Sequence, residues 1–245
     1  MRDVITVMWK ETQEFFGNRR FLWVFALAVL AMGVLPVLTL AHHSGPLASA
    51  TSSLGALFRG MYVLFAAVIV VGNTAPDLVL HERVGHTLDY LLTTRLPDYA
   101  IFGAKVLISF AIGYLAAMLA LGIQLVATGL IGGAGWHWLS LALPLGRVVI
   151  PEQISFGISA GLSLYVAVVG TFVALRVGEQ RAAYLVSILS VGVLLIPFLV
   201  GWIHLSLTLP WVSHAAMILG AVAVFLGLVG LRIFRRDMLV LYLQE

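Results

Sequence analysis

The residues best suited to chemistry form a short charged stretch, His81-Glu82-Arg83, with His86 close behind it. Two histidines beside a glutamate resemble the zinc hydrolase motif H-E-x-x-H, which places both histidines on one face of a helix. Here the histidines are five residues apart, so their side chains point about 140° away from each other around a helix. The spacing therefore disfavours a zinc site, and we expect neither a catalytic residue nor a metal or other cofactor in this chain.

Other motifs for chemistry are weak or missing. The adjacent pair His42-His43 has no partner at a fixed spacing, so we expect solvated or interfacial side chains there rather than ligands. The sequence contains no G-x-x-x-x-G-K-[ST] phosphate loop, which excludes ATP hydrolysis through that motif. It has no cysteine, so disulfides and thiolate metal sites are also excluded. A net charge of +3, spread along the chain in short clusters, argues against nucleic acid as a partner.

The elements that must position these residues are membrane helices. Of the 245 residues 61% are hydrophobic and 10% charged, more apolar than a water-soluble fold of this length can bury. A hydrocarbon core of about 30 Å needs about 20 apolar residues in a helix. We therefore predict an all-α polytopic fold, a single transmembrane domain over residues 1–245 with six transmembrane helices and an N-terminal amphipathic helix. The predicted spans are Phe21 to Ala41, Leu54 to Ala75, Ala100 to Ala127, Ile154 to Leu175, Ala182 to Ile203 and Trp211 to Leu231.

The distribution of lysine and arginine predicts the orientation of these spans. With the N-terminus inside, only Arg59 and Arg147 fall in outer segments, which matches the retention of positive loops in the cytoplasm. No small-residue cleavage site follows the first apolar stretch, so we expect the first helix to stay in the membrane. The expected location is the plasma membrane, with both termini cytoplasmic and lipids as neighbours.

All eleven acidic residues fall outside the six predicted spans or at their rims. Proton- and sodium-coupled carriers commonly place ionisable groups near the middle of the membrane. Uphill transport by this chain would therefore need energy from elsewhere, and a separate ATPase is the natural source. The predicted spans hold modest polar groups, among them Asn73, Thr74, Gln124 and Thr171, which favour an amphipathic or lipid-like substrate over a bare ion.

The segment 76–99, between the second and third predicted spans, is the most informative. Leu80, Val84, Leu88 and Leu91 recur at helical spacing, and polar residues occupy another side. This pattern predicts an amphipathic cytoplasmic helix that begins near Pro76, packs on the inner surface of the bundle and presents a charged face. A helix lying among lipid headgroups without a partner remains an alternative.

A second pattern concerns packing between helices. Gly157 and Gly161 form a G-x-x-x-G pair with serines nearby, which allows close approach of another helix. We expect these residues to pack against another helix of the same chain, and an interface between two chains remains an alternative.

The residues after the second span carry a recognisable order. They read Glu82-Arg83-Val84-Gly85-His86-Thr87-Leu88-Asp89-Tyr90-Leu91-Leu92, then Thr93-Thr94-Arg95-Leu96-Pro97, and later Gly103-Ala104-Lys105. This order resembles the permease subunits of ABC transporters of the second membrane type, an exporter class. Their pattern is E-R-x-x-G-T-L-E-x-L-L, followed by a short Thr/Ser-Pro stretch and a lysine that opens the third span. His86 stands where that family usually has glycine, and Pro97 lies two places later than the usual proline. Two other stretches match the family more loosely. The family's N-terminal amphipathic helix is similar to the stretch around Trp9-Lys10-Glu11, and its cytoplasmic segment after the last span is similar to Leu231 to Asp237.

The resemblance implies that segment 76–99 is a coupling helix, which fits a groove on an ATP-binding cassette subunit and transmits its closure to the spans. The residues carried over as an ATPase-coupling interface, either as surface contacts or as orienting groups, are Glu82, Arg83, His86, Thr87 and Asp89. ATP and magnesium would then bind to the partner subunit, and a second permease copy, identical or related, would complete a dimer.

Other functions remain open beside this one. A passive channel or ion-coupled carrier without an ATPase is the main alternative. An intramembrane enzyme, and a sensor or immunity subunit that binds an ATPase without transporting, are two further possibilities.

Overall fold

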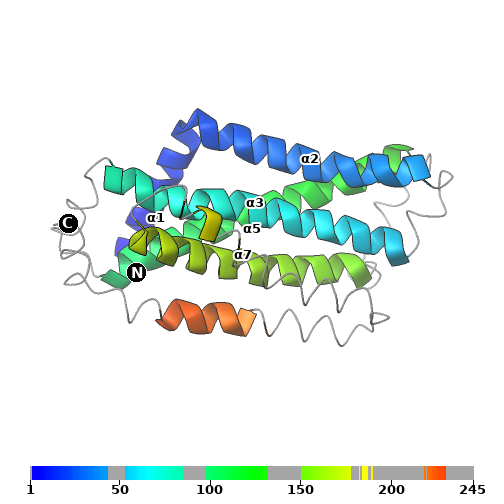
Figure 1. Cartoon of the computed structure of the whole chain (residues 1–245). Helices are drawn as coiled ribbons and strands as arrows, with labels where there is room; N and C mark the ends of the chain where they lie inside the picture. Colours follow the sequence, from blue (N-terminus) through cyan, green and yellow to red (C-terminus); the bar gives the residue numbers. More distant parts are fainter. Residues whose placement is uncertain are drawn as a thin grey trace.

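The computed structural model describes residues 2–43, 53–84, 98–131 and 150–177, together with residues 182, 184–186, 189, 218 and 220–229. In these residues the chain is helical, with no strand. α2, α3, α5 and α7 run side by side, α1 lies at the end of this bundle where α2 begins, and residues 220–229 form a further helix beside α7 (Figure 1). The helices with described bounds are α1 (Arg2–Gly17), α2 (Arg19–His43), α3 (Ser53–Val84), α5 (Asp98–Ile131) and α7 (Ile150–Arg176).

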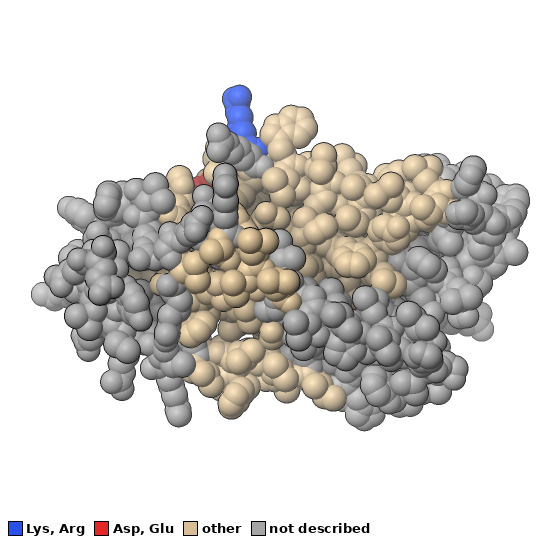
Figure 2. All heavy atoms as spheres, viewed as in Figure 1, with Lys and Arg blue, Asp and Glu red and all other residues tan. Residues whose placement is uncertain are grey.

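Four of these helices are long and apolar enough to cross a membrane, over Phe21–Thr39, Gly60–Glu82, Ala100–Ala127 and Gly157–Leu175. They indicate a membrane-embedded protein, and charged side chains are sparse on the described part of the face shown in Figure 2. Apolar helices long enough to cross a membrane cover the first, third and fourth predicted spans to within three residues at each end. The fifth and sixth lie largely outside the described residues, although the apolar helix Gly220–Val229 falls within the sixth.

The bounds predicted for the second span are wrong. α3 continues without a break from Ser53 to Val84, and its apolar stretch ends at Glu82 rather than at Ala75. The expected amphipathic helix does not begin at Pro76, because residues 76–84 are the last turns of α3. Its 32 residues span about 48 Å, well beyond the hydrocarbon thickness. Asp77 therefore lies within the last two turns of this apolar stretch, although the sequence placed every acid outside the spans or at their rims.

Proline ends many helices, but α3 continues through Pro76, which leaves the carbonyl of Gly72, four residues earlier, without its usual donor. In the turns before Pro76, Asn73 Nδ2 donates to the Ile69 carbonyl at 2.6 Å, and Thr74 Oγ1 donates to the Val70 carbonyl at 2.9 Å. These bonds hold polar side chains against the helix itself, which suits a segment buried among apolar neighbours.

One residue, Asn18, separates α1 from α2. Its backbone N–H donates to the Glu14 carbonyl at 3.1 Å and closes α1, while its own carbonyl accepts from Leu22 at 3.3 Å and opens α2. Asparagine favours such a position at a helix start. The junction therefore needs no loop, and α1 is held close to the beginning of the first span.

Small residues let the helices of the bundle approach closely. A side chain at Gly113 of α5 would overlap Val71 of α3, and one at Gly33 of α2 would come within 2.7 Å of Ile123 of α5. In α7, Ser159 and Ser163 are fully buried on the side that packs in the same core as α3. Gly161 is buried as well, but Gly157 is exposed, so packing within the chain accounts for only part of the predicted G-x-x-x-G face.

A second proline, Pro36 in the middle of α2, has a partner in another helix. Pro36 has no N–H to offer the Met32 carbonyl, and Gln124 Nε2 of α5 donates to that oxygen at 2.9 Å. Gln124 is fully buried. The polar groups at 74 and 124, which the sequence offered as features of a substrate path, are therefore occupied inside the protein.

We expect Gln124→Leu to lower the free energy of unfolding by about 1–3 kcal/mol, because it leaves the Met32 carbonyl buried without a donor. Pro36→Ala restores an N–H four residues after Met32, so the double variant should lose less than Gln124→Leu alone. Thermal unfolding of the detergent-solubilised protein, followed by tryptophan fluorescence, measures both. Equal losses with and without Pro36→Ala would contradict this pairing.

Candidate functional site

Charged side chains from three helices meet at the end of the bundle occupied by α1. Lys105 of α5 is 2% exposed, and its Nζ donates to Glu11 Oε1 at 2.8 Å and to the Leu78 carbonyl at 2.9 Å. The same Nζ lies 2.7 Å from Glu82 Oε2 in an ion pair. Three acceptors match the three protons of an ammonium group. Lys105 therefore joins α5 to both α1 and α3.

A second lysine approaches the same carboxylate from the solvent side. Lys10 Nζ donates to Glu82 Oε1 at 3.0 Å and lies 3.4 Å from Glu14 one turn along α1. Its side chain is 41% exposed, against 2% for Glu82. Glu82 is thus held between two lysines that come from different helices. We call Lys10, Glu11, Glu82 and Lys105 the ionic cluster.

The sequence of α1 explains why a glutamate is buried there. Val7, Glu11 and Phe15 follow one another at four-residue spacing, so they share one face of the helix. All three are at most 4% exposed, while Trp9 and Phe16 point outward at more than 60% exposure. Glu11 therefore lies on the packed stripe of α1 between two apolar residues, and Lys105 supplies the charge that this position needs.

For Glu11 and for Lys10, burial and the opposite charges nearby shift the pKa in opposite directions. Burial raises the pKa of Glu11 above its ordinary value of 4.5, and the nearby Glu82 adds to this, while Lys105 and Lys10 hold the pKa back. For Lys10, partial burial lowers the pKa, but the hydrogen bond and charge of Glu82 outweigh it and raise the pKa above 10.5. Lys10 therefore stays charged at physiological pH, and its contribution to stability is lost only as pH rises through that raised value.

The cluster is suited to holding helices together rather than to catalysis. Its two lysines and two glutamates cancel in charge, and each lysine is paired with a glutamate. Among the described residues, no group of three or more histidine, aspartate or glutamate side chains could hold a metal ion. Removing the buried Lys105 would leave Glu11 and Glu82 buried without compensation, which is costly in a low-dielectric interior.

The structure places only part of the predicted coupling interface. Glu82 is buried in the ionic cluster, so the role of surface contact is wrong for it, whereas a role as an orienting group fits. Arg83 belongs to the last turn of α3, but its side chain is not described. His86, Thr87 and Asp89 lie in residues 85–97, outside the described part.

Sequence reasoning missed Lys10, Glu11 and Lys105 as members of one site. Two signals were available. Glu11 interrupts an apolar stripe at four-residue spacing, and Lys105 stands inside an otherwise apolar span. An ionisable residue within a span requires a partner. What the sequence lacks is the partner's identity, because Glu11 and Lys105 are 94 residues apart.

Comparison with known proteins gives this chain no family. It matches no family model, and no curated protein is significantly similar to it. The resemblance to exporter permeases therefore depends on the residues from Glu82 to Lys105.

We expect Lys105→Met to lower the free energy of unfolding by about 3–5 kcal/mol at neutral pH, because it leaves two buried carboxylates without their shared cation. The pKa of Glu11 is already raised, so loss of this cation raises it further. Protonation then relieves the repulsion, and part of the stability should return as the pH is lowered.

The matched control is Lys10→Met, which removes a half-exposed lysine from the same cluster and should cost less than about 1 kcal/mol. Melting temperatures of both variants between about pH 5 and pH 8 provide the measurement. Equal losses for the two lysines, or no recovery of Lys105→Met in acid, would show that Lys105 does not hold the cluster.

Proposed function

We propose that this chain is the membrane-spanning permease subunit of an ATP-driven ABC transporter, which exports an amphipathic or lipid-like substrate. A separate ATP-binding subunit, carrying ATP and magnesium, supplies the energy. Two permease chains, identical or related, form the dimer, and both termini lie on the cytoplasmic side of the plasma membrane.

The observation that supports this proposal most is the contact between the two ends of the resembling stretch. Glu82 opens that stretch, Lys105 falls near its end, and their charged atoms lie 2.7 Å apart. An ion pair therefore joins the two helices, α3 and α5, that this stretch of sequence connects. A force applied to this segment by a partner would reach α3, α5 and, through Glu11, α1 at once. Such a connection suits a segment that couples a soluble motor to membrane helices.

The main alternative is a passive channel or an ion-coupled carrier without an ATPase. Asp77 is a half-buried acid in the last turns of the second apolar stretch, nearer its end than the mid-membrane position common in such carriers. Transport driven by an ion gradient alone, and abolished by Asp77→Asn, would favour this alternative.

The coupling role is tested best at Asp89, because Glu82 also serves stability. We expect Asp89→Lys to reduce the amount of ATP-binding protein that co-purifies with the tagged chain by about tenfold or more, since it reverses a charge at the proposed contact. The melting temperature of the permease should change little. The measurement is affinity purification from native membranes in mild detergent, with ATP hydrolysis assayed in the eluate.

Gln13→Lys on the exposed side of α1 is the control, because it adds a lysine at a surface position outside the proposed contact. It should leave co-purification unchanged. Recovery of the wild-type chain alone, without ATP hydrolysis, would contradict the proposed function. Equal retention of the ATPase by Asp89→Lys would reject the coupling segment.

A further inference from the structure

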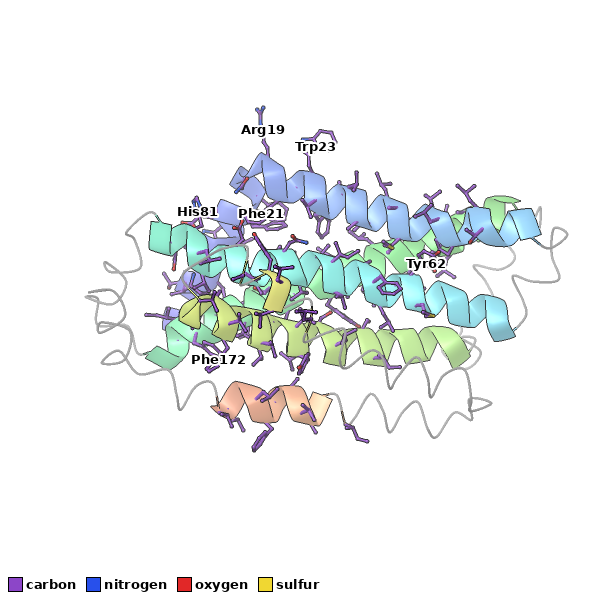
Figure 3. All side chains as sticks on the ribbon, viewed as in Figure 1. Arg19, Phe21, Trp23, Tyr62, His81 and Phe172 are labelled. Carbon is purple, nitrogen blue, oxygen red and sulfur yellow. The ribbon has the colours of Figure 1, made fainter. Side chains whose placement is uncertain are left out.

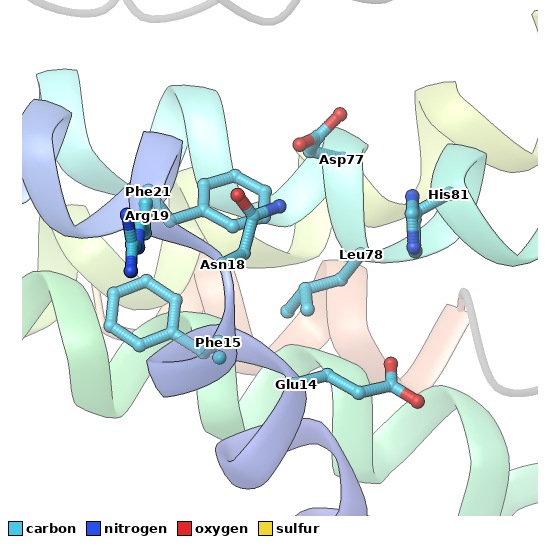
Figure 4. A pocket seen from close by; sticks show the side chains of 9 residues that line it. Glu14, Phe15, Asn18, Arg19, Phe21, Asp77, Leu78 and His81 are labelled. Carbon is cyan, nitrogen blue, oxygen red and sulfur yellow. The ribbon is translucent and has the colours of Figure 1, made fainter.

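A pocket of about 370 Å³ lies between the α1–α2 junction and the last turns of α3. Its volume is within the range of small-ligand sites, about 300–1,000 Å³. Arg19 and Phe21 line one side of it and His81 the other, as Figure 4 shows. We call it the junction pocket. It is separate from the ionic cluster, although Glu14 lines the pocket and also lies 3.4 Å from Lys10.

The depth of the junction pocket follows from the spans on either side. The first span begins at Phe21 and the second ends at Glu82, and both of these ends are next to pocket residues. The pocket is therefore at the membrane–water boundary, where lipid headgroups lie. A ligand that reaches it from the bilayer would bring its polar end into the pocket and leave its apolar part in the membrane.

The polar groups of the junction pocket carry both signs of charge. Arg19 offers N–H donors, which suit a phosphate, and Glu14 and Asp77 offer carboxylates, which suit a protonated amine. Asp77 also makes contacts within the protein. A carboxylate can accept several hydrogen bonds at once.

An apolar stripe continues from the pocket along the outer face of α2. Trp23 follows Arg19 by one turn, and both side chains project from the same side of the helix (Figure 3). Trp23, Leu27 and Leu30 are 57–74% exposed, and the stripe continues to Leu38. From Trp23 to Leu38 the helix rises about 22 Å, comparable to an extended acyl chain. Tryptophan at this depth is typical of the interface between headgroups and chains.

We propose that the junction pocket binds the headgroup of an ethanolamine phospholipid, whose acyl chain lies along the exposed stripe of α2. The phosphate contacts Arg19 on one side of the pocket, and the ammonium lies towards the other side, against Asp77, Glu14 and His81. A headgroup with a net negative charge meets two carboxylates and is disfavoured, whereas a choline headgroup has no N–H to donate to them. This site does not depend on whether the chain works with an ATPase.

The test is native mass spectrometry of the detergent-solubilised chain with an equimolar mixture of phosphatidylethanolamine, phosphatidylcholine and phosphatidylglycerol of identical acyl chains. We expect the ethanolamine lipid to be retained preferentially. Asp77→Asn and Arg19→Gln should each lower its retention about tenfold, the effect of removing one charge-assisted hydrogen bond. Gln13→Ala, outside the pocket, should retain the lipid as the wild type does.

Two further measurements complete the test. The first distinguishes a variant that loses the pocket from one that loses the fold. The second distinguishes a site for the whole lipid from a site for the free headgroup. His81→Gln changes an exposed side chain and should reduce retention without harming the fold, so the test stands even if Asp77→Asn unfolds. Water-soluble glycerophosphoethanolamine at the lipid's concentration should not displace the lipid. Equal retention of the three lipids, no effect of Arg19→Gln and His81→Gln, or displacement by the soluble headgroup would each overturn the proposal.

Discussion

A lysine ammonium buried at the end of an apolar helix must have acceptors, and Lys105 takes them from two other helices. Its contacts with Glu11, Glu82 and the Leu78 carbonyl fix where α1 packs and where α3 ends relative to α5. The cost of leaving any of these charges alone is several kcal/mol, more than most single contacts contribute. The arrangement of this end of the bundle follows from that requirement.

The same physical rule explains the contacts of two polar side chains elsewhere in the described bundle. In an apolar environment every buried polar group must find its partner inside the protein. Gln124 bonds to the carbonyl that Pro36 leaves free, and Thr74 bonds back to its own helix before Pro76. These polar side chains, which in the sequence could belong to a substrate path, serve the backbone. An open path, if the chain transports, would require a different arrangement of the helices.

Hydropathy and length were enough to predict the all-helical class and three of the spans. The prediction failed at Pro76 and Asp77, because a proline and an acid usually mark the end of a span, and here α3 continues for two more turns with most of its residues buried. The sequence identified Glu82 as a site residue but offered it as a surface contact. Its burial could not be predicted, because it depends on Lys105 and Lys10 from distant parts of the chain. Local periodicity carries no information about such pairs. The pattern of α1, with Glu11 between Val7 and Phe15, was the strongest local sign that a buried charge needs a partner.

The central claim is that Lys105 holds α1 in a single position against the bundle, and a distance measurement tests it most directly. Because the chain has no cysteine, two can be introduced at the exposed positions Gln13 of α1 and Leu115 of α5 and spin-labelled. We predict one narrow distance distribution in lipid nanodiscs, which broadens with Lys105→Met and stays narrow with Lys10→Met. An unchanged distribution in Lys105→Met would contradict the claim, because α1 would then keep its place without the buried lysine.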